Sequence, residues 1–110
     1  MRGRRGGRGS AAARGAGEGL ALIGRIIAAI TSVIALIIVI GILLIVLEAN
    51  PSNAIVEFFT DLAKTLVGPF DDLFTPGNRK LRVAINWGIA AFLWFLAGRI
   101  VAGLLGRGRR

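Results

Sequence analysis

The feature that most constrains this chain is a run without a charged residue from Ile26 to Leu47. As an α-helix it measures about 33 Å, which matches a hydrocarbon core about 30 Å thick. The run is apolar on all sides and is interrupted only by Thr31, Ser32 and Gly41, so it lacks the polar face of a soluble surface helix. A chain of 110 residues has little further mass to bury such a helix. The run therefore predicts a transmembrane helix over residues 20–47.

A second run, Val83 to Leu105, contains one charge, Arg99. That arginine lies near the end of the run, where its long side chain can carry the guanidinium to the lipid headgroups. Trp87 suits the opposite interface, whereas Trp94 is too deep for an aromatic belt and is expected to pack against a neighbour. A second transmembrane helix is therefore predicted over residues 82–105. The fold class expected is all-α, an integral membrane hairpin whose two helices are joined by an external amphipathic helix.

The distribution of charge predicts how the hairpin is oriented. The net charge of +8 divides into +5 over residues 1–25, −1 over 48–82 and +4 over 83–110. Because Lys and Arg near the ends of spans favour the cytoplasm, both termini are expected there and residues 48–81 outside. A cluster at residues 79–82 opposes this orientation but is outnumbered. The residues expected to set the topology and contact anionic lipids are Arg2, Arg4, Arg5, Arg8, Arg14, Arg25, Arg99, Arg107, Arg109 and Arg110.

The N-terminal tail, residues 1–19, is rich in Gly, Ala and Arg and has no apolar residue larger than Ala after Met1. Such a segment buries too little surface to offset its ordering entropy, so disorder is predicted, and residues 106–110 form a second basic tail. Arg-Gly spacing is also typical of tracts that bind RNA, but no aromatic residue is interleaved for stacking. Topology and lipid binding are therefore favoured over nucleic acid. A cleavable signal peptide fits poorly, because the apolar run is too long and lacks a cleavage site.

The external segment contains a pattern typical of an amphipathic helix over about 51–67. Its apolar face has Phe58, Phe59 and Leu62 as the expected contacts for lipid or a partner protein. Either Asn50, followed by Pro51, or Ser52 can cap the helix, and Gly68-Pro69 ends it. The full apolar face is Ile55, Phe58, Phe59, Leu62, Ala63 and Leu66, and the polar face is Asn53, Glu57, Thr60, Asp61 and Lys64.

Catalytic, metal and cofactor sites are not expected. The chain has no Cys and no His, which removes the commonest thiolate and imidazole chemistry. Ser32 has no titratable neighbour within its span. The two acid pairs, Glu57 with Asp61 and Asp71 with Asp72, are more typical of solvated surfaces than of an acid-base or cation site.

Small residues recur every fourth position in both spans, and this spacing favours close helix packing in lipid. The stripes could face each other within one hairpin or face another copy in a homo-oligomer, and chance spacing in an Ala- and Gly-rich chain is a third interpretation. Asn86 is expected to donate a cross-helix hydrogen bond. The stripes are Gly24, Ala28 and Ser32 in the first span and Gly98, Ala102 and Gly106 in the second.

The run Asn50-Pro51-Ser52-Asn53-Ala54-Ile55-Val56-Glu57-Phe58, followed by Thr60, Pro69-Phe70, Leu73-Phe74 and Pro76, resembles the repeat unit of the YggT family of small bacterial membrane proteins. The resemblance covers roughly residues 34–105. It implies a protein of the bacterial inner membrane with a span, an Asn-Pro-led amphipathic segment and a second span, and with a role in envelope processes such as osmotic response or division. The chain departs from the family in having Glu48-Ala49 where an aromatic residue usually precedes Asn-Pro, and Asp71-Asp72 where basic residues are usual.

Three functions are compatible with the sequence. The first is a non-enzymatic adaptor or modulator of envelope machinery, with an envelope protein or a second copy as partner. The second is an oligomeric pore or holin-like permeabiliser, which the scarcity of polar residues in the spans disfavours. The third is a membrane tether that binds nucleic acid through the basic tail, with salt-sensitive affinity.

Overall fold

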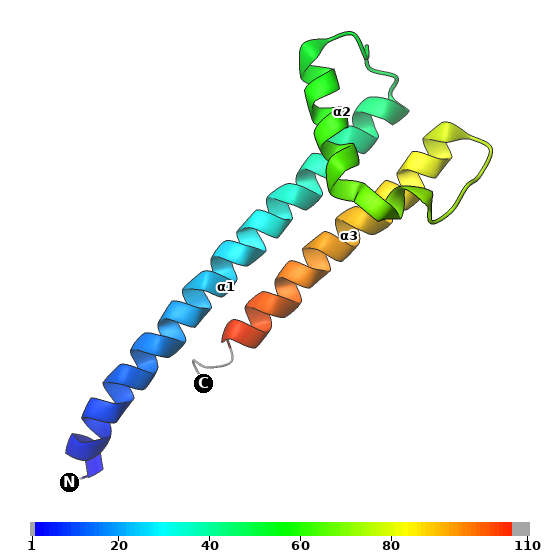
Figure 1. The fold of residues 1–110 in the computed structure, drawn as a ribbon. Helices are drawn as coiled ribbons and strands as arrows, with labels where there is room; N and C mark the ends of the chain where they lie inside the picture. The colour runs from blue at the N-terminus through cyan, green and yellow to red at the C-terminus, as the bar shows by residue number, and fades with distance from the viewer. Residues whose placement is uncertain (1, 107–110) are drawn as a thin grey trace.

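The computed structural model describes the backbone of residues 2–106 and the side chains of residues 15–106. Within that part the chain is all-helical, as predicted, in the order α1 (Arg2–Val46), α2 (Ala54–Val67), the 3-10 helix η1 (Gly68–Asp72) and α3 (Arg79–Gly106). α1 and α3 run antiparallel, and α2 with η1 lies over one end of the pair (Figure 1). Below, residues 47–78 are called the connecting segment.

Both long helices have the length and composition of membrane spans, over Gly15–Val46 and Arg79–Gly106. α1 ends at Val46, one residue before the predicted end at residue 47, and α3 covers 79–106 where 82–105 was predicted. In each, 17% of the most apolar window is buried against the rest of the chain. The core helix of a soluble protein would be mostly buried, so these two helices leave an apolar surface that nothing in residues 15–106 covers.

α1 begins at Arg2 rather than near Leu20, so the helix continues through residues that the sequence assigns to a tail. The disorder predicted for residues 1–19 stays a prediction. Extending an existing helix avoids the unfavourable nucleation step, whereas the glycines of this segment disfavour helix. Composition alone describes an isolated segment, whereas this one continues a long stable helix. The side chains of residues 2–14, and the predicted tail at residues 107–110, lie outside the described part of the chain.

The first helix ends in a Schellman motif, which satisfies carbonyls that have no partner within the helix. Ala49 N donates to Leu44 O at 2.8 Å, and Glu48 N donates to Ile45 O at 3.1 Å. This motif requires a left-handed residue, and Glu48 adopts it with φ of 57° where glycine is usual. The Glu48 carboxylate forms an ion pair with Lys80, with Oε1 and Nζ 3.1 Å apart. This pair also joins the end of α1 to the start of α3.

The amphipathic helix begins later than predicted. Asn53 is its N-cap, and its side-chain oxygen accepts hydrogen bonds from Ile55 N and Val56 N at 2.9 and 3.3 Å. Neither cap proposed from the sequence is correct. Asn50 instead accepts a hydrogen bond from Ser52 N at 3.0 Å, forming an Asx turn that precedes the helix. The predicted end is correct, because Gly68 takes φ of 55° at the C-cap.

Replacing Asn53 by alanine is expected to lower the free energy of unfolding by about 1 kcal/mol, because two backbone N–H groups lose their acceptor. Asn50→Ala is the matched control. It removes one exposed hydrogen bond and is expected to cost less than about 0.5 kcal/mol. Denaturant unfolding of the purified protein in detergent micelles measures both. Equal losses in the two variants would contradict the assignment of Asn53 as the cap.

The two long helices approach most closely where glycine leaves room. A Cβ added at Gly24 would lie 3.1 Å from the Cα of Ala102. A Cβ added at Gly98 would lie 2.7 Å from the Cβ of Thr31 and overlap its hydroxyl. The Thr31 hydroxyl donates within its own helix, to Ile27 O at 3.0 Å, so it is satisfied at this apolar contact. Two predicted small residues therefore lie at the interface within one hairpin.

The connecting segment folds back onto the hairpin. A Cβ added at Gly41 would lie 2.6 Å from the Cβ of Ala63 and 3.1 Å from the Trp87 ring, so α2 crosses α1 at this glycine. Ala63 and Val67 are fully buried there. The core lies where the three helices meet and comprises Ile38, Ala63, Val67, Val83, Trp87, Ala90 and Ala91.

Candidate functional site

Asn86 fixes the connecting segment to α3. Its side chain is fully buried, and its amide nitrogen donates to Asp71 O at 2.6 Å and to Phe74 O at 2.7 Å. Its oxygen accepts from Phe74 N at 2.9 Å. The sequence predicted a hydrogen bond from Asn86 to another helix, but the partners are the backbone of η1 and the residues after it. One amide thus satisfies three backbone groups of a segment that turns back toward the start of α3.

The two acids of η1 each have a partner on α3. Asp71 accepts a hydrogen bond from Trp87 Nε1 at 2.8 Å, and Asp72 is paired with Arg82. These contacts give the Asp71-Asp72 pair a structural role. Among residues 15–106, no group of three or more His, Cys, Asp or Glu side chains is placed to hold a metal ion.

Trp94 holds the other end of α2. It lies about 18 Å along α3 from Arg82, at 1.5 Å per residue, and its indole nitrogen donates to Leu66 O at 2.9 Å. Leu66 is in the last turn of α2, where carbonyls lack partners within the helix. The prediction that Trp94 packs against a neighbour is confirmed, and that neighbour is the C-terminal end of α2. The C-terminal end of α2 therefore packs against α3 at Trp94, far along the helix from the charged residues at the start of α3.

Replacing Trp94 by phenylalanine is expected to lower the free energy of unfolding by about 1.5 kcal/mol, because the Leu66 carbonyl loses its donor in an apolar place. Phe92→Leu is the control, since it alters an exposed aromatic residue of the same helix. Denaturant unfolding measures both, and amide exchange over residues 66–70 reports the local effect. Unchanged exchange in the Trp94 variant would contradict this role.

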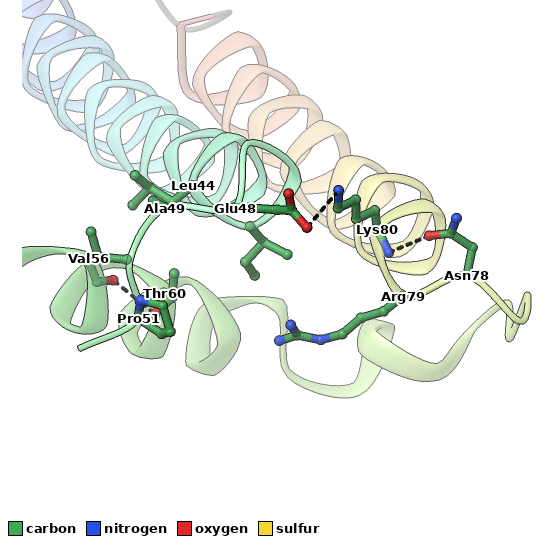
Figure 2. Close-up of a pocket in the computed structure, with 10 residues that line it drawn as sticks. Leu44, Glu48, Ala49, Pro51, Val56, Thr60, Asn78, Arg79 and Lys80 are labelled. Carbon is green, nitrogen blue, oxygen red and sulfur yellow. Dashed lines mark hydrogen bonds and ion pairs between the residues drawn. The ribbon is translucent and has the colours of Figure 1, made fainter. Parts of the chain in front are cut away.

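Two adjoining cavities lie between the connecting segment, the C-terminal end of α1 and the start of α3. The larger, about 550 Å³, is bounded by the C-terminal end of α1, the N-terminal half of α2 and the start of α3 (Figure 2). The smaller, about 400 Å³, lies between α2, η1 and α3, and is here called the charged cavity. Ile45, Thr60 and Arg79 line both. The charged cavity is further lined by Asp61, Lys64, Asp71, Arg82, Val83 and Trp87.

The Arg79 side chain extends from the start of α3 toward α2, between the two elements (Figure 2). Its neighbour Lys80 forms an ion pair with Glu48. In contrast, neither Arg79 nor Lys64 lies within ion-pair distance of an acid among the described residues. The Nε atom of Arg82 is buried and has no hydrogen-bond partner in that part of the chain. Among the described residues, the charged cavity is thus lined by two basic side chains that have no acid partner.

The predicted contact residues on α2 differ in their exposure. Phe58 is 60% exposed, whereas Phe59 and Leu62 are half-buried. Phe58 and Phe59 form an edge-to-face pair with centroids 5.3 Å apart. The predicted apolar face therefore does not face one environment: Ala63 packs inward, and Ile55 and Phe58 point away from the hairpin.

The predicted packing residues are likewise divided. Gly24, Gly98 and Ala102 lie at the α1–α3 contact, and Ala28 is half-buried. Gly106 has open space where a Cβ would be, so it makes no close helix contact. Ser32 is half-buried, and its neighbour Thr31 occupies the interface position instead.

The predicted topology arginines with described side chains, Arg25 and Arg99, are both exposed, and the guanidinium carbon of Arg99 lies 5.7 Å from the centroid of the Phe95 ring. Sequence reasoning missed Gly41 as a crossing point. Its position as the one small residue among the large apolar residues 36–47 is the signal that could have found it. It also missed Arg79 as a cavity residue, because the cavity depends on the fold of the connecting segment.

No protein-family profile, curated protein or solved structure matches this chain.

Proposed function

We propose that the chain is an integral membrane protein in which α1 and α3 cross the bilayer as a hairpin. The support is the spacing of charges along the two helices. Arg82 and Arg99 lie about 26 Å apart along α3, and Arg25 and Glu48 about 34 Å apart along α1. Because the helices are antiparallel, these four residues form two charged levels. The apolar band between them matches a hydrocarbon core about 30 Å thick.

The orientation we propose places both ends of the chain in the cytoplasm of a bacterium and the connecting segment outside. The excess of arginine at the two ends supports it through the positive-inside rule. With this orientation, the charged cavity lies at the outer headgroup level, and the end of α2 lies in the outer half of the bilayer. The Trp94 and Gly68 contacts satisfy carbonyls of α2 there, as an apolar medium requires.

We further propose that the protein acts without catalysis, as an adaptor or modulator of envelope machinery. The observation that carries this proposal is the apolar side of α2 that faces away from the hairpin, with Ile55 67% and Phe58 60% exposed. Exposed aromatic residues at the level of the interface are suited to a partner helix or lipid. The resemblance of the Asn-Pro segment to the YggT family supports the same class of role.

A pore formed by one hairpin is disfavoured by the α1–α3 packing, because Gly24 and Gly98 bring the two backbones too close for a water path between them. A nucleic-acid tether would depend on residues 2–14, whose side chains are outside the described part. Ion conductance in vesicles and salt-sensitive RNA binding, respectively, would support these alternatives.

A photo-crosslinking residue at Phe58 tests the adaptor proposal in native membranes. Crosslinking to one defined protein is expected from positions 58 and 55, which share a face of α2. The same probe at Phe92, exposed on the apolar part of α3, is the control and is expected to give lipid adducts. Lipid adducts alone from all three positions would contradict an adaptor role for this face.

A further inference from the structure

We propose that the charged cavity binds the phosphodiester headgroup of one phospholipid. This inference rests on the proposed insertion of α1 and α3 in a membrane. The cavity lies beside Arg82 and Trp87 at the start of α3, which is the level at which an inserted hairpin meets the phosphates. The proposed ligand is therefore present at high local concentration where the cavity opens.

The donors of the cavity favour an anion. Lys64 of α2 and Arg79 of α3 both line it, and neither has an acid partner among residues 15–106. Arg82 is paired with Asp72 and its Nε atom is enclosed, so it is not a donor for a ligand in the cavity. Arg79 supplies the guanidinium group, and guanidinium groups bind phosphate through paired hydrogen bonds.

The two acids that line the cavity form no ion pair with Lys64 or Arg79. Asp71 already accepts the Trp87 indole hydrogen, and this contact fixes its carboxylate against α3. Asp61 is the one lining acid without such a contact in the described part. It is available to accept hydrogen bonds from a headgroup hydroxyl or ammonium. The lining residues alone carry +1, from three bases and two acids, and Asp72 outside the lining offsets the charge of Arg82. Arg79 and Lys64 are therefore the bases available to a phosphate.

The remaining wall explains why a lipid is favoured over a soluble phosphate. Ile45, Val83 and the Trp87 ring line the same cavity. These apolar groups would contact the glycerol and upper acyl carbons beneath the phosphate. A free phosphate could use the donors but would leave this wall uncovered.

Native mass spectrometry of the full chain in neutral detergent micelles, titrated with phosphatidylglycerol, tests the inference. We expect each of two single variants, Arg79→Gln and Lys64→Gln, to raise the dissociation constant of the first bound lipid about tenfold. This is the effect of losing one charge-assisted hydrogen bond. Lys80→Gln is the matched control. It removes the same charge at the same end of the molecule, but its ammonium is held by Glu48, so a change within about twofold is expected.

Two further ligands show which part of the lipid the cavity recognises: diacylglycerol lacks the phosphate, and glycerol phosphate lacks the acyl chains. Diacylglycerol with the same chains is expected to give no specific adduct, and excess glycerol phosphate is expected not to displace the lipid. Equal weakening in Arg79→Gln and Lys80→Gln, or binding of diacylglycerol, would overturn the inference. Displacement by glycerol phosphate would also overturn it, in favour of a soluble phosphate. Resistance to carbonate extraction tests membrane insertion separately, so an inserted protein that binds no headgroup contradicts this inference alone.

Discussion

Gly98→Leu is expected to lower the free energy of unfolding by about 3 kcal/mol and to separate α1 from α3. A Cβ at this position would already overlap the Thr31 hydroxyl and lie 2.7 Å from its Cβ. The obstacle is a β-branched side chain on a helix rather than the end of a flexible one, so it cannot move aside cheaply. The two helices must therefore shift apart, which disrupts the close contact at Gly24 as well.

Gly103→Leu is the matched control for this change, because a Cβ at Gly103 meets nothing within 4 Å. It adds the same side chain to the same helix and is expected to change stability by less than about 0.5 kcal/mol. Denaturant unfolding in micelles, followed by the fluorescence of Trp94 one turn away, measures both. Equal stability of the two variants would contradict the α1–α3 interface described above.

Asn86→Ala is expected to release the segment from Asp71 to Phe74 and to lower the free energy of unfolding by about 3 kcal/mol. The substitution leaves three backbone groups without their buried partner, each at a cost of about 1–3 kcal/mol before the segment moves to recover part of it. Release of the segment allows water or other groups to satisfy them. The sign of the effect follows from desolvation and does not depend on the surrounding medium.

Hydrogen exchange at the Phe74 amide measures this effect directly, since that N–H donates to Asn86 at 2.9 Å. Exchange is expected to accelerate by at least about 100-fold, which corresponds to the loss of about 3 kcal/mol of local protection. Asn78→Ala is the control, because it removes exposed hydrogen bonds from Lys80 N and Leu81 N at the start of α3. Protection of Phe74 that survives in Asn86→Ala would contradict the anchoring role.

The two long helices could be predicted because their signal is local. An uncharged run such as Ile26–Leu47 has the length of a span, and its charged neighbour Glu48 marks the C-terminal end of α1 to within two residues. The C-terminal end of α2 could be predicted for a similar reason, since Gly68 is one of few residues that favour positive φ. Its N-terminal end could not, because Asn50, Ser52 and Asn53 are equally good caps in isolation.

The position of α2 against the hairpin could not be predicted from its periodicity. Hydrophobic periodicity identifies apolar side chains, but it does not say whether lipid or protein will cover them. Phe58 and Ala63 therefore belonged to one predicted face, although the structure exposes the first and buries the second. Side-chain size carried the missing information, because only a residue as small as Ala63 fits against Gly41.

The candidate site depends still more on tertiary structure. Asn86 was recognisable as a polar residue in a span that needed a partner, but its partners are backbone groups 12 and 15 residues earlier. Arg79 looked like one charge of a basic cluster. Its separate role follows from Lys80 being paired with Glu48 and Arg82 with Asp72, and those pairs require the connecting segment to fold back.

A hairpin that crosses the membrane twice can be tested by single-cysteine labelling, because the chain has no Cys. Cysteine is introduced separately at Ser10, Ser52 and Gly106, and right-side-out membrane vesicles are treated with a membrane-impermeant maleimide. The hairpin predicts labelling of position 52 in intact vesicles, and labelling of positions 10 and 106 only after permeabilisation. Labelling of all three positions in intact vesicles would contradict it.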